Sequence, residues 1–120
     1  MGIRNRSIAV AAISAVALAG AASPALAQKK TITVTTPKSS PFAFTGMPKT
    51  LKAGTYTFRY VNKSGIGHNL MFLKSASTAR KGTPIFTSGA RTVRVTLKKG
   101  TARYVCTPHA SIMKGTIRVT

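Results

Sequence analysis

The chain has 120 residues and a formal net charge of +19, because its 19 lysines and arginines are balanced by no aspartate or glutamate. Without carboxylate side chains it has no paired acids for glycoside hydrolysis, no aspartate-oriented catalytic triad and no oxygen-rich calcium cage. Any metal site must therefore be built from histidine, cysteine, methionine or backbone groups.

The positive charge leaves two interpretations open. It can be a solvated surface suited to the medium, or it can attract an anionic partner such as an acidic redox protein, an envelope polymer or a lipid headgroup. Composition alone does not separate these interpretations.

The N-terminal segment has the pattern of a secretory signal peptide. Two arginines near the start precede an apolar, alanine-rich run, and an A-x-A pattern ends at Ala27. We therefore expect a signal peptide over 1–27 and one exported domain over 28–120, located in the periplasm, the cell envelope or outside the cell. No second apolar run predicts a transmembrane anchor in the mature chain.

Short stretches after this segment alternate apolar and polar residues with the period of a β-strand or, at 69–73, form an apolar run consistent with a buried strand. They are residues 31–35, 49–52, 55–62, 69–73, 91–97, 102–105 and 115–119. A short helical turn is expected within 75–81. Strands of this length separated by turn signals predict an all-β fold, a Greek-key β-sandwich or barrel of about 6–8 strands.

The alternation also predicts which side chains face the core. The inward residues are expected to be Ile32, Val34, Tyr56, Phe58, Tyr60, Val93, Val95, Leu97, Ile117 and Val119. The aromatic stripe on 55–62 is therefore assigned to core packing rather than to the stacking of bases. Met47 and Met71 are likewise assigned to core or surface positions.

Chemistry is concentrated near the C-terminus, where Cys106, His109 and Met113 share one short loop. The only other histidine is His68. A single cysteine in an exported protein cannot form an internal disulfide, so it is paired between chains, accidental or bound to a metal. One thiolate, two imidazoles and a thioether are the ligands of a blue-copper electron-transfer site. The spacing therefore favours a metal.

The C-terminal loop closely resembles that of the cupredoxins, in particular the plastocyanin and pseudoazurin type. The matching pattern is Tyr104-x-Cys106-x-Pro108-His109, followed by Met113 and a glycine-containing final strand. A second match lies upstream, where the pair His68-Asn69 follows the turn that runs from Asn62 to Gly65. The resemblance covers roughly residues 53–119.

This resemblance implies one copper ion bound by His68, Cys106, His109 and Met113. It also implies that Asn69 joins the two ligand loops, with its backbone N–H directed at the Cys106 sulfur and its side chain bonded to Thr107. Pro108 would remove a second N–H donor near the sulfur. Three residues separate His109 from Met113, whereas plastocyanin-type loops commonly have four and amicyanin-type loops two. The resemblance therefore specifies the distance between the Met113 sulfur and the copper less closely than the other three ligand distances.

The leading functional prediction is an exported one-electron carrier that is not an enzyme and functions as a monomer. Electrons would pass through the exposed edge of His109, beside an apolar docking patch containing Gly67, Pro108 and Ala110. The partner would be a redox protein with an acidic docking surface, and no specific nucleic acid is expected. Two alternatives remain, a copper-binding or copper-delivery protein without electron transfer, and a secreted polycation that binds nucleic acid or envelope polymer.

Overall fold

The computed structural model describes residues 30–120 of the chain. The predicted signal peptide over 1–27 lies outside the described residues and stays a prediction. Within the described part, no helix has the length and apolar character needed to span a membrane.

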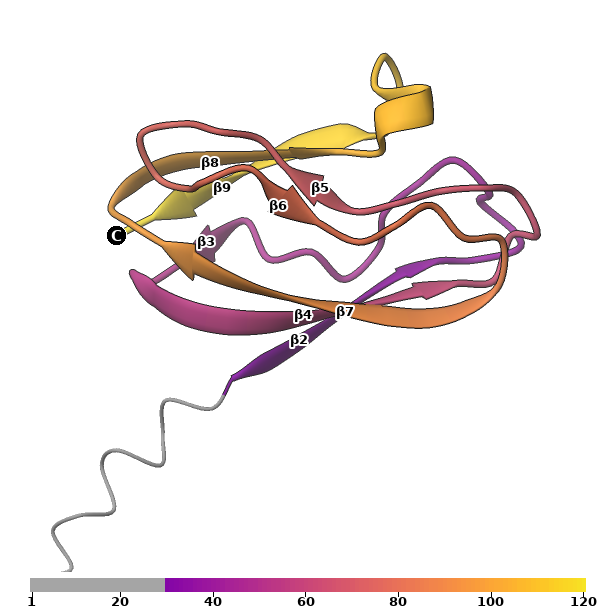
Figure 1. The fold of residues 1–120 in the computed structure, drawn as a ribbon, viewed down its shortest axis with the longest axis horizontal. Helices are drawn as coiled ribbons and strands as arrows, with labels where there is room; N and C mark the ends of the chain where they lie inside the picture. Colours follow the sequence, from indigo (N-terminus) through magenta and orange to yellow (C-terminus); the bar gives the residue numbers. More distant parts are fainter. Residues whose placement is uncertain (1–29) are drawn as a thin grey trace, which may run out of the picture.

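The described chain forms two β-sheets that pack face to face (Figure 1). Their strands are β2 (Thr31–Thr36), β3 (Thr50–Leu51), β4 (Gly54–Asn62), β5 (Met71–Phe72), β6 (Lys81–Gly82), β7 (Gly89–Leu97), β8 (Gly100–Val105) and β9 (Lys114–Val119). One sheet has the order β2-β4-β7 and the other has the order β3-β9-β8-β5-β6. The chain crosses repeatedly between the sheets, and the predicted all-β sandwich is confirmed.

The hydrophobic core lies between the two sheets. β4 contributes the aromatic stripe of Tyr56, Phe58 and Tyr60, which are at most 4% exposed, so its predicted core role is confirmed. The remaining buried strand residues come from both layers: Val34, Phe72, Val93, Val95, Leu97, Ala102, Val105, Ile117 and Val119. Ile32 is half-buried against the same core.

Strand pairing brings several loops to one end of the sandwich. β4 and β7 are antiparallel, and Asn62 at the end of β4 pairs with Gly89 at the start of β7. β8 and β9 are also antiparallel, and Val105 pairs with Lys114 across the loop that joins them. This loop contains the 3₁₀ turn η3 (Thr107–His109) and projects from the end of its sheet (Figure 1).

Two predicted elements differ from the structure. The helical turn expected within 75–81 is wrong, because Ser75 and Thr78 form an antiparallel bridge and the chain then enters β6. The strand expected over 69–73 is shorter, since Leu70 bonds through its N–H and its carbonyl oxygen to Thr83 rather than to a regular neighbouring strand. β6 itself was not predicted.

Candidate metal centre

His68 reaches the site through the turn that follows β4. The side chain of Asn62 organises this turn, since its Oδ1 accepts from the Ser64 N–H at 3.0 Å and its Nδ2 donates to the Ile66 carbonyl oxygen at 2.7 Å. Beyond the turn, the His68 N–H donates to the Phe86 carbonyl oxygen at 3.1 Å. The His68 backbone is therefore held by the preceding turn and by its hydrogen bond to Phe86.

Cys106 and His109 are positioned by the loop after β8. The Cys106 N–H donates to the Met113 carbonyl oxygen at 2.9 Å, which closes the loop at its base. The His109 N–H donates to the Cys106 carbonyl oxygen at 3.0 Å, so η3 turns the imidazole back over the thiol. Pro108 suits this turn because its fixed φ is compatible with the first residues of a helix.

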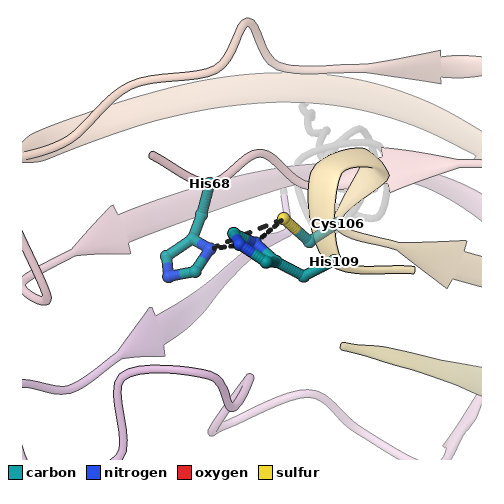
Figure 2. A group of neighbouring side chains, drawn as sticks. All are labelled: His68, Cys106 and His109. Carbon is teal, nitrogen blue, oxygen red and sulfur yellow. Dashed lines mark hydrogen bonds between the residues drawn. The ribbon is translucent and has the colours of Figure 1, made fainter. Parts of the chain in front are cut away.

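The three side chains converge on one point (Figure 2). The Nδ1 atoms of His68 and His109 are 3.2 Å apart, and each lies 3.5 Å from the Cys106 Sγ. A point equidistant from these three atoms is about 2.0 Å from each of them. This is the bond length of a transition metal to imidazole nitrogen and slightly less than that to thiolate sulfur, so the donor set fits an ion at its centre.

The hydrogen bonding of His68 assigns its tautomer. Its Nε2 lies 2.7 Å from the Pro41 carbonyl oxygen, and because a carbonyl only accepts, Nε2 carries the proton. The Nδ1 atom is then unprotonated, and its lone pair is directed at the His109 Nδ1 and the Cys106 Sγ. Burial lowers the pKa of His68, the Pro41 carbonyl opposes this change, and the nearby His109 adds to it. The ring is therefore kept neutral, as a metal ligand requires.

Comparison with known proteins agrees with this geometry. The sequence profile of the copper-binding proteins of the plastocyanin/azurin family matches residues 30–120.

The chain belongs to this family.

Its cofactor is copper, which the donor set of two imidazoles and a thiol suits. A comparison with curated protein sequences finds no significant match.

Solved structures show that the chain has the cupredoxin fold. Auracyanin A, a "blue" copper protein from Chloroflexus aurantiacus, matches with a TM-score of 0.54 and 24% identity, covering 75% of this chain and 98% of auracyanin. Two Cu(I) structures of amicyanin variants each match with a TM-score of 0.51. Their identities are 22% and 24%, and they cover 75% and 77% of this chain and 82% and 84% of amicyanin.

The cysteine of this cupredoxin lies in an enclosed position. Its thiol is 0% exposed, and burial raises the pKa of Cys106, while the backbone N–H groups of Asn69 and His109 lower it. The direct hydrogen bond predicted from the Asn69 N–H to the sulfur stays a prediction. The Asn69 side chain also bonds to Thr107, which confirms the predicted link between the two ligand loops.

Met113 follows Cys106 and His109 on the same loop and is 1% exposed. Its carbonyl oxygen bonds to Cys106, and its N–H donates to the His109 carbonyl oxygen at 2.8 Å. The loop from Cys106 to Met113, called the copper loop below, therefore holds the Met113 backbone at two points. The axial role of its sulfur stays a prediction.

Sequence reasoning did not assign Pro41 and Phe42 to the site. The Pro41 carbonyl oxygen fixes the tautomer of His68, and the Phe42 ring packs against both histidine rings. The two residues lie in the long connection between β2 and β3, far from either motif. The one local feature there is an aromatic residue after a proline, and it does not indicate which part of the fold the ring contacts.

Proposed function

We propose that this protein is a one-electron carrier in which His68, Cys106, His109 and Met113 hold one copper ion. Copper supplies a one-electron couple between Cu(II) and Cu(I). The observation that carries the proposal is the convergence of two imidazole Nδ1 atoms and one thiol, with mutual distances of 3.2–3.5 Å, at a single point.

The chain's own residues favour electron transfer over substrate chemistry. His68 and Cys106 are 0% exposed, so no open side of the site is available to a substrate through them. The sequence contains no carboxylate and no further histidine for proton transfer. We therefore propose a non-enzymatic role. His109 is half-buried, and its edge is the proposed route for the electron.

The exposure of several apolar residues near His109 in the sequence supports a docking patch around this proposed route. Pro108 and Ala110 of the predicted docking patch are exposed, and Gly67 is half-buried. The large apolar side chains exposed among the described residues are Phe42, Ile85 and Ile112. Ile112 is on the copper loop, and Ile85 is close enough to Gly67 for a Cβ there to lie 3.2 Å from it. Such a surface suits brief contact with a partner without a lasting complex.

We further propose that the partner is a redox protein with an acidic docking surface and that this protein works as an exported monomer. Of the 19 lysines and arginines, 17 lie outside the predicted signal peptide, and this charge without any acidic residue supports electrostatic attraction of an anionic partner. The signal-peptide pattern supports a periplasmic, cell-envelope or extracellular location.

The first test is a visible absorption spectrum of the domain over 28–120 during addition of Cu(II), compared with Cys106→Ser. We expect an intense thiolate-to-copper charge-transfer band that is absent from the variant and is bleached reversibly by a reductant. A weak spectrum that Cys106→Ser leaves unchanged would refute the proposed ligand set. Copper bound through Cys106 without a reversible couple would instead favour copper delivery.

The charge proposal has a separate test. The rate at which hexacyanoferrate(III), an anion, oxidises the reduced protein should fall steeply as salt rises from about 0.01 to 0.15 M, because screening removes the attraction. A cationic cobalt(III) complex should show the opposite trend. Equal salt dependence for both oxidants would contradict an electrostatically steered partner.

A further inference from the structure

We propose that Phe42 is a positioning residue that holds the His109 ring in its ligating orientation and keeps water away from the copper. This inference rests on the proposed function, since it concerns the same ligands. The Phe42 ring lies edge-on to both imidazoles, with centroid distances of 5.1 Å to His109 and 5.7 Å to His68. The interplanar angles are 76° and 82°.

The two imidazoles differ in what fixes their orientation. His68 is anchored at its far nitrogen by the Pro41 carbonyl oxygen. Within residues 30–120, the Nε2 of His109 has no hydrogen-bond partner, so the ring's distal edge is held by packing alone. An edge-on aromatic pair is attractive and prefers one geometry. His109 forms two such pairs, with the His68 ring at 4.9 Å and with the Phe42 ring at 5.1 Å, and Phe42 is the partner that is not itself one of the three donors.

Phe42 is itself firmly held, although its ring is 40% exposed. The next aromatic residue, Phe44, packs inward against Tyr60 and Tyr104 at 5.4 and 5.6 Å between centroids. Beyond it, Thr45 pairs with Thr35 through two backbone hydrogen bonds of 2.7 and 2.9 Å. The segment therefore has a fixed path, which places the partly exposed Phe42 ring against the histidines.

The second proposed effect of Phe42 is to exclude water from the copper, because its ring lies between His109 and solvent. His109 is the one half-buried member of the three-donor cluster, and Phe42 covers part of it. An oxidised copper–thiolate centre carries one more positive charge than the reduced centre, so water stabilises the oxidised form more. A hydrophobic cover that excludes water therefore raises the reduction potential and slows release of the ion.

The test compares Phe42→Ala with Phe42→Tyr, which keeps the aromatic ring, and Phe42→Leu, which keeps only apolar bulk. Ile112→Ala is the matched control for three readouts that involve no partner docking, because it removes a still more exposed apolar side chain that makes no aromatic contact with the histidine rings. Each protein is examined for the rate of copper release to a chelator, the reduction potential and the NMR signals of the His109 ring in copper-free and Cu(I) forms.

We expect Phe42→Ala to release copper about tenfold faster, to have a lower potential and to lose the ring-current shift of the His109 protons. Phe42→Tyr should restore all three properties, Phe42→Leu should restore the potential and the slow release but not the ring-current shift, and Ile112→Ala should match the wild type. The inference is overturned if Phe42→Ala matches the wild type, or if Ile112→Ala changes the release rate as much. The NMR readout on copper-free protein is independent of the blue band, so failure of the ligand set and failure of this inference are distinguishable.

Discussion

The side chain of Asn69 makes a two-point contact with Thr107 across the two ligand loops. Its Oδ1 accepts from the Thr107 N–H at 2.8 Å, and its Nδ2 donates to the Thr107 Oγ1 at 3.1 Å. Asn69 directly follows His68, and Thr107 directly follows Cys106. One amide side chain therefore sets the spacing between two proposed copper ligands that are far apart in the sequence.

Loss of this contact should weaken both the fold and the metal site. Asn69→Ala leaves the Thr107 N–H without its partner, so we expect the free energy of unfolding of the copper-free protein to fall by about 2 kcal/mol. Copper affinity should fall by about 10–100-fold, as is usual when a group that orients a ligand is removed. Urea unfolding and competition with a chelator measure the two effects.

Thr107→Ala is the matched control for this contact. It removes the Oγ1 but keeps the backbone N–H bonded to Asn69, so the expected loss is only about 0.5–1.5 kcal/mol. If the two variants are equally stable, the backbone bond is not the main stabilising part of the contact, and the prediction is wrong.

The contacts that could be predicted from sequence are those that local periodicity or a compact motif specifies. Alternation along 55–62 identified the buried faces of Tyr56, Phe58 and Tyr60, because period-two patterns report directly on a half-buried strand. The motif around Cys106 and the pair His68-Asn69 located both proposed ligand loops, because this combination of cysteine, histidine and methionine is typical of a metal site.

The contacts that could not be predicted depend on long-range pairing. The path of Pro41 and Phe42 follows from the bridge between Thr35 and Thr45, and no local sequence pattern predicts this bridge. The segment at 75–81 contains residues compatible with a helix, but the Ser77 carbonyl oxygen accepts from the Lys98 N–H at 2.8 Å, and this tertiary contact prevails over local propensity.

The axial role of Met113 can be tested by removing its sulfur while keeping its volume. Met113→Leu should change the free energy of unfolding by less than about 1.5 kcal/mol, because the two side chains are similar in size. The charge-transfer band should remain, since the three converging donors are intact. We expect the reduction potential to rise by on the order of 60 mV, a tenfold change in a one-electron equilibrium, because loss of a weak donor disfavours Cu(II).

Met47→Leu is the control, because Met47 is a partly buried core contact outside the copper loop. It should leave the potential unchanged, as measured by voltammetry of both variants. An unchanged potential in Met113→Leu would assign Met113 to core packing alone.

The stability of the copper-free protein should depend on pH at both extremes. Because burial lowers the pKa of His68 below its ordinary value of 6.5, the unfolded state binds more protons as pH falls below 6.5. Stability present at neutral pH is therefore lost on acidification, with a slope of up to about 1.4 kcal/mol per pH unit for one proton.

At alkaline pH the slope of stability against pH has the opposite sign. Burial raises the pKa of Cys106 above 9.0 and raises the pKa of Tyr60 to about 12, so the unfolded state releases protons first and stability falls as pH rises above 9. Urea midpoints from pH 5 to 11 should form a plateau between about 6.5 and 9. In His68→Gln the fall of the urea midpoint below pH 6.5 should become smaller. An unchanged fall would exclude His68 as its cause.

Gly115 is required by the position of the Tyr104 ring. The two residues are directly paired between β8 and β9, and a Cβ on Gly115 would lie 2.5 Å from the Tyr104 Cζ and overlap its hydroxyl. Tyr104 cannot easily move aside, because its ring packs against Phe44 and Phe72 at 5.6 and 6.1 Å between centroids. Gly115→Ala should therefore destabilise the copper-free protein by about 1–3 kcal/mol in urea unfolding.

A double-mutant cycle separates this steric cause from a general effect on β9. In a Tyr104→Ala background, Gly115→Ala should cost less than about 0.5 kcal/mol, because the obstructing ring is gone. Thr116→Ala, an exposed change in the same strand, should also stay within about 0.5 kcal/mol. Equal destabilisation by Gly115→Ala in both backgrounds would show that strand geometry, not the tyrosine, selects glycine beside the copper loop.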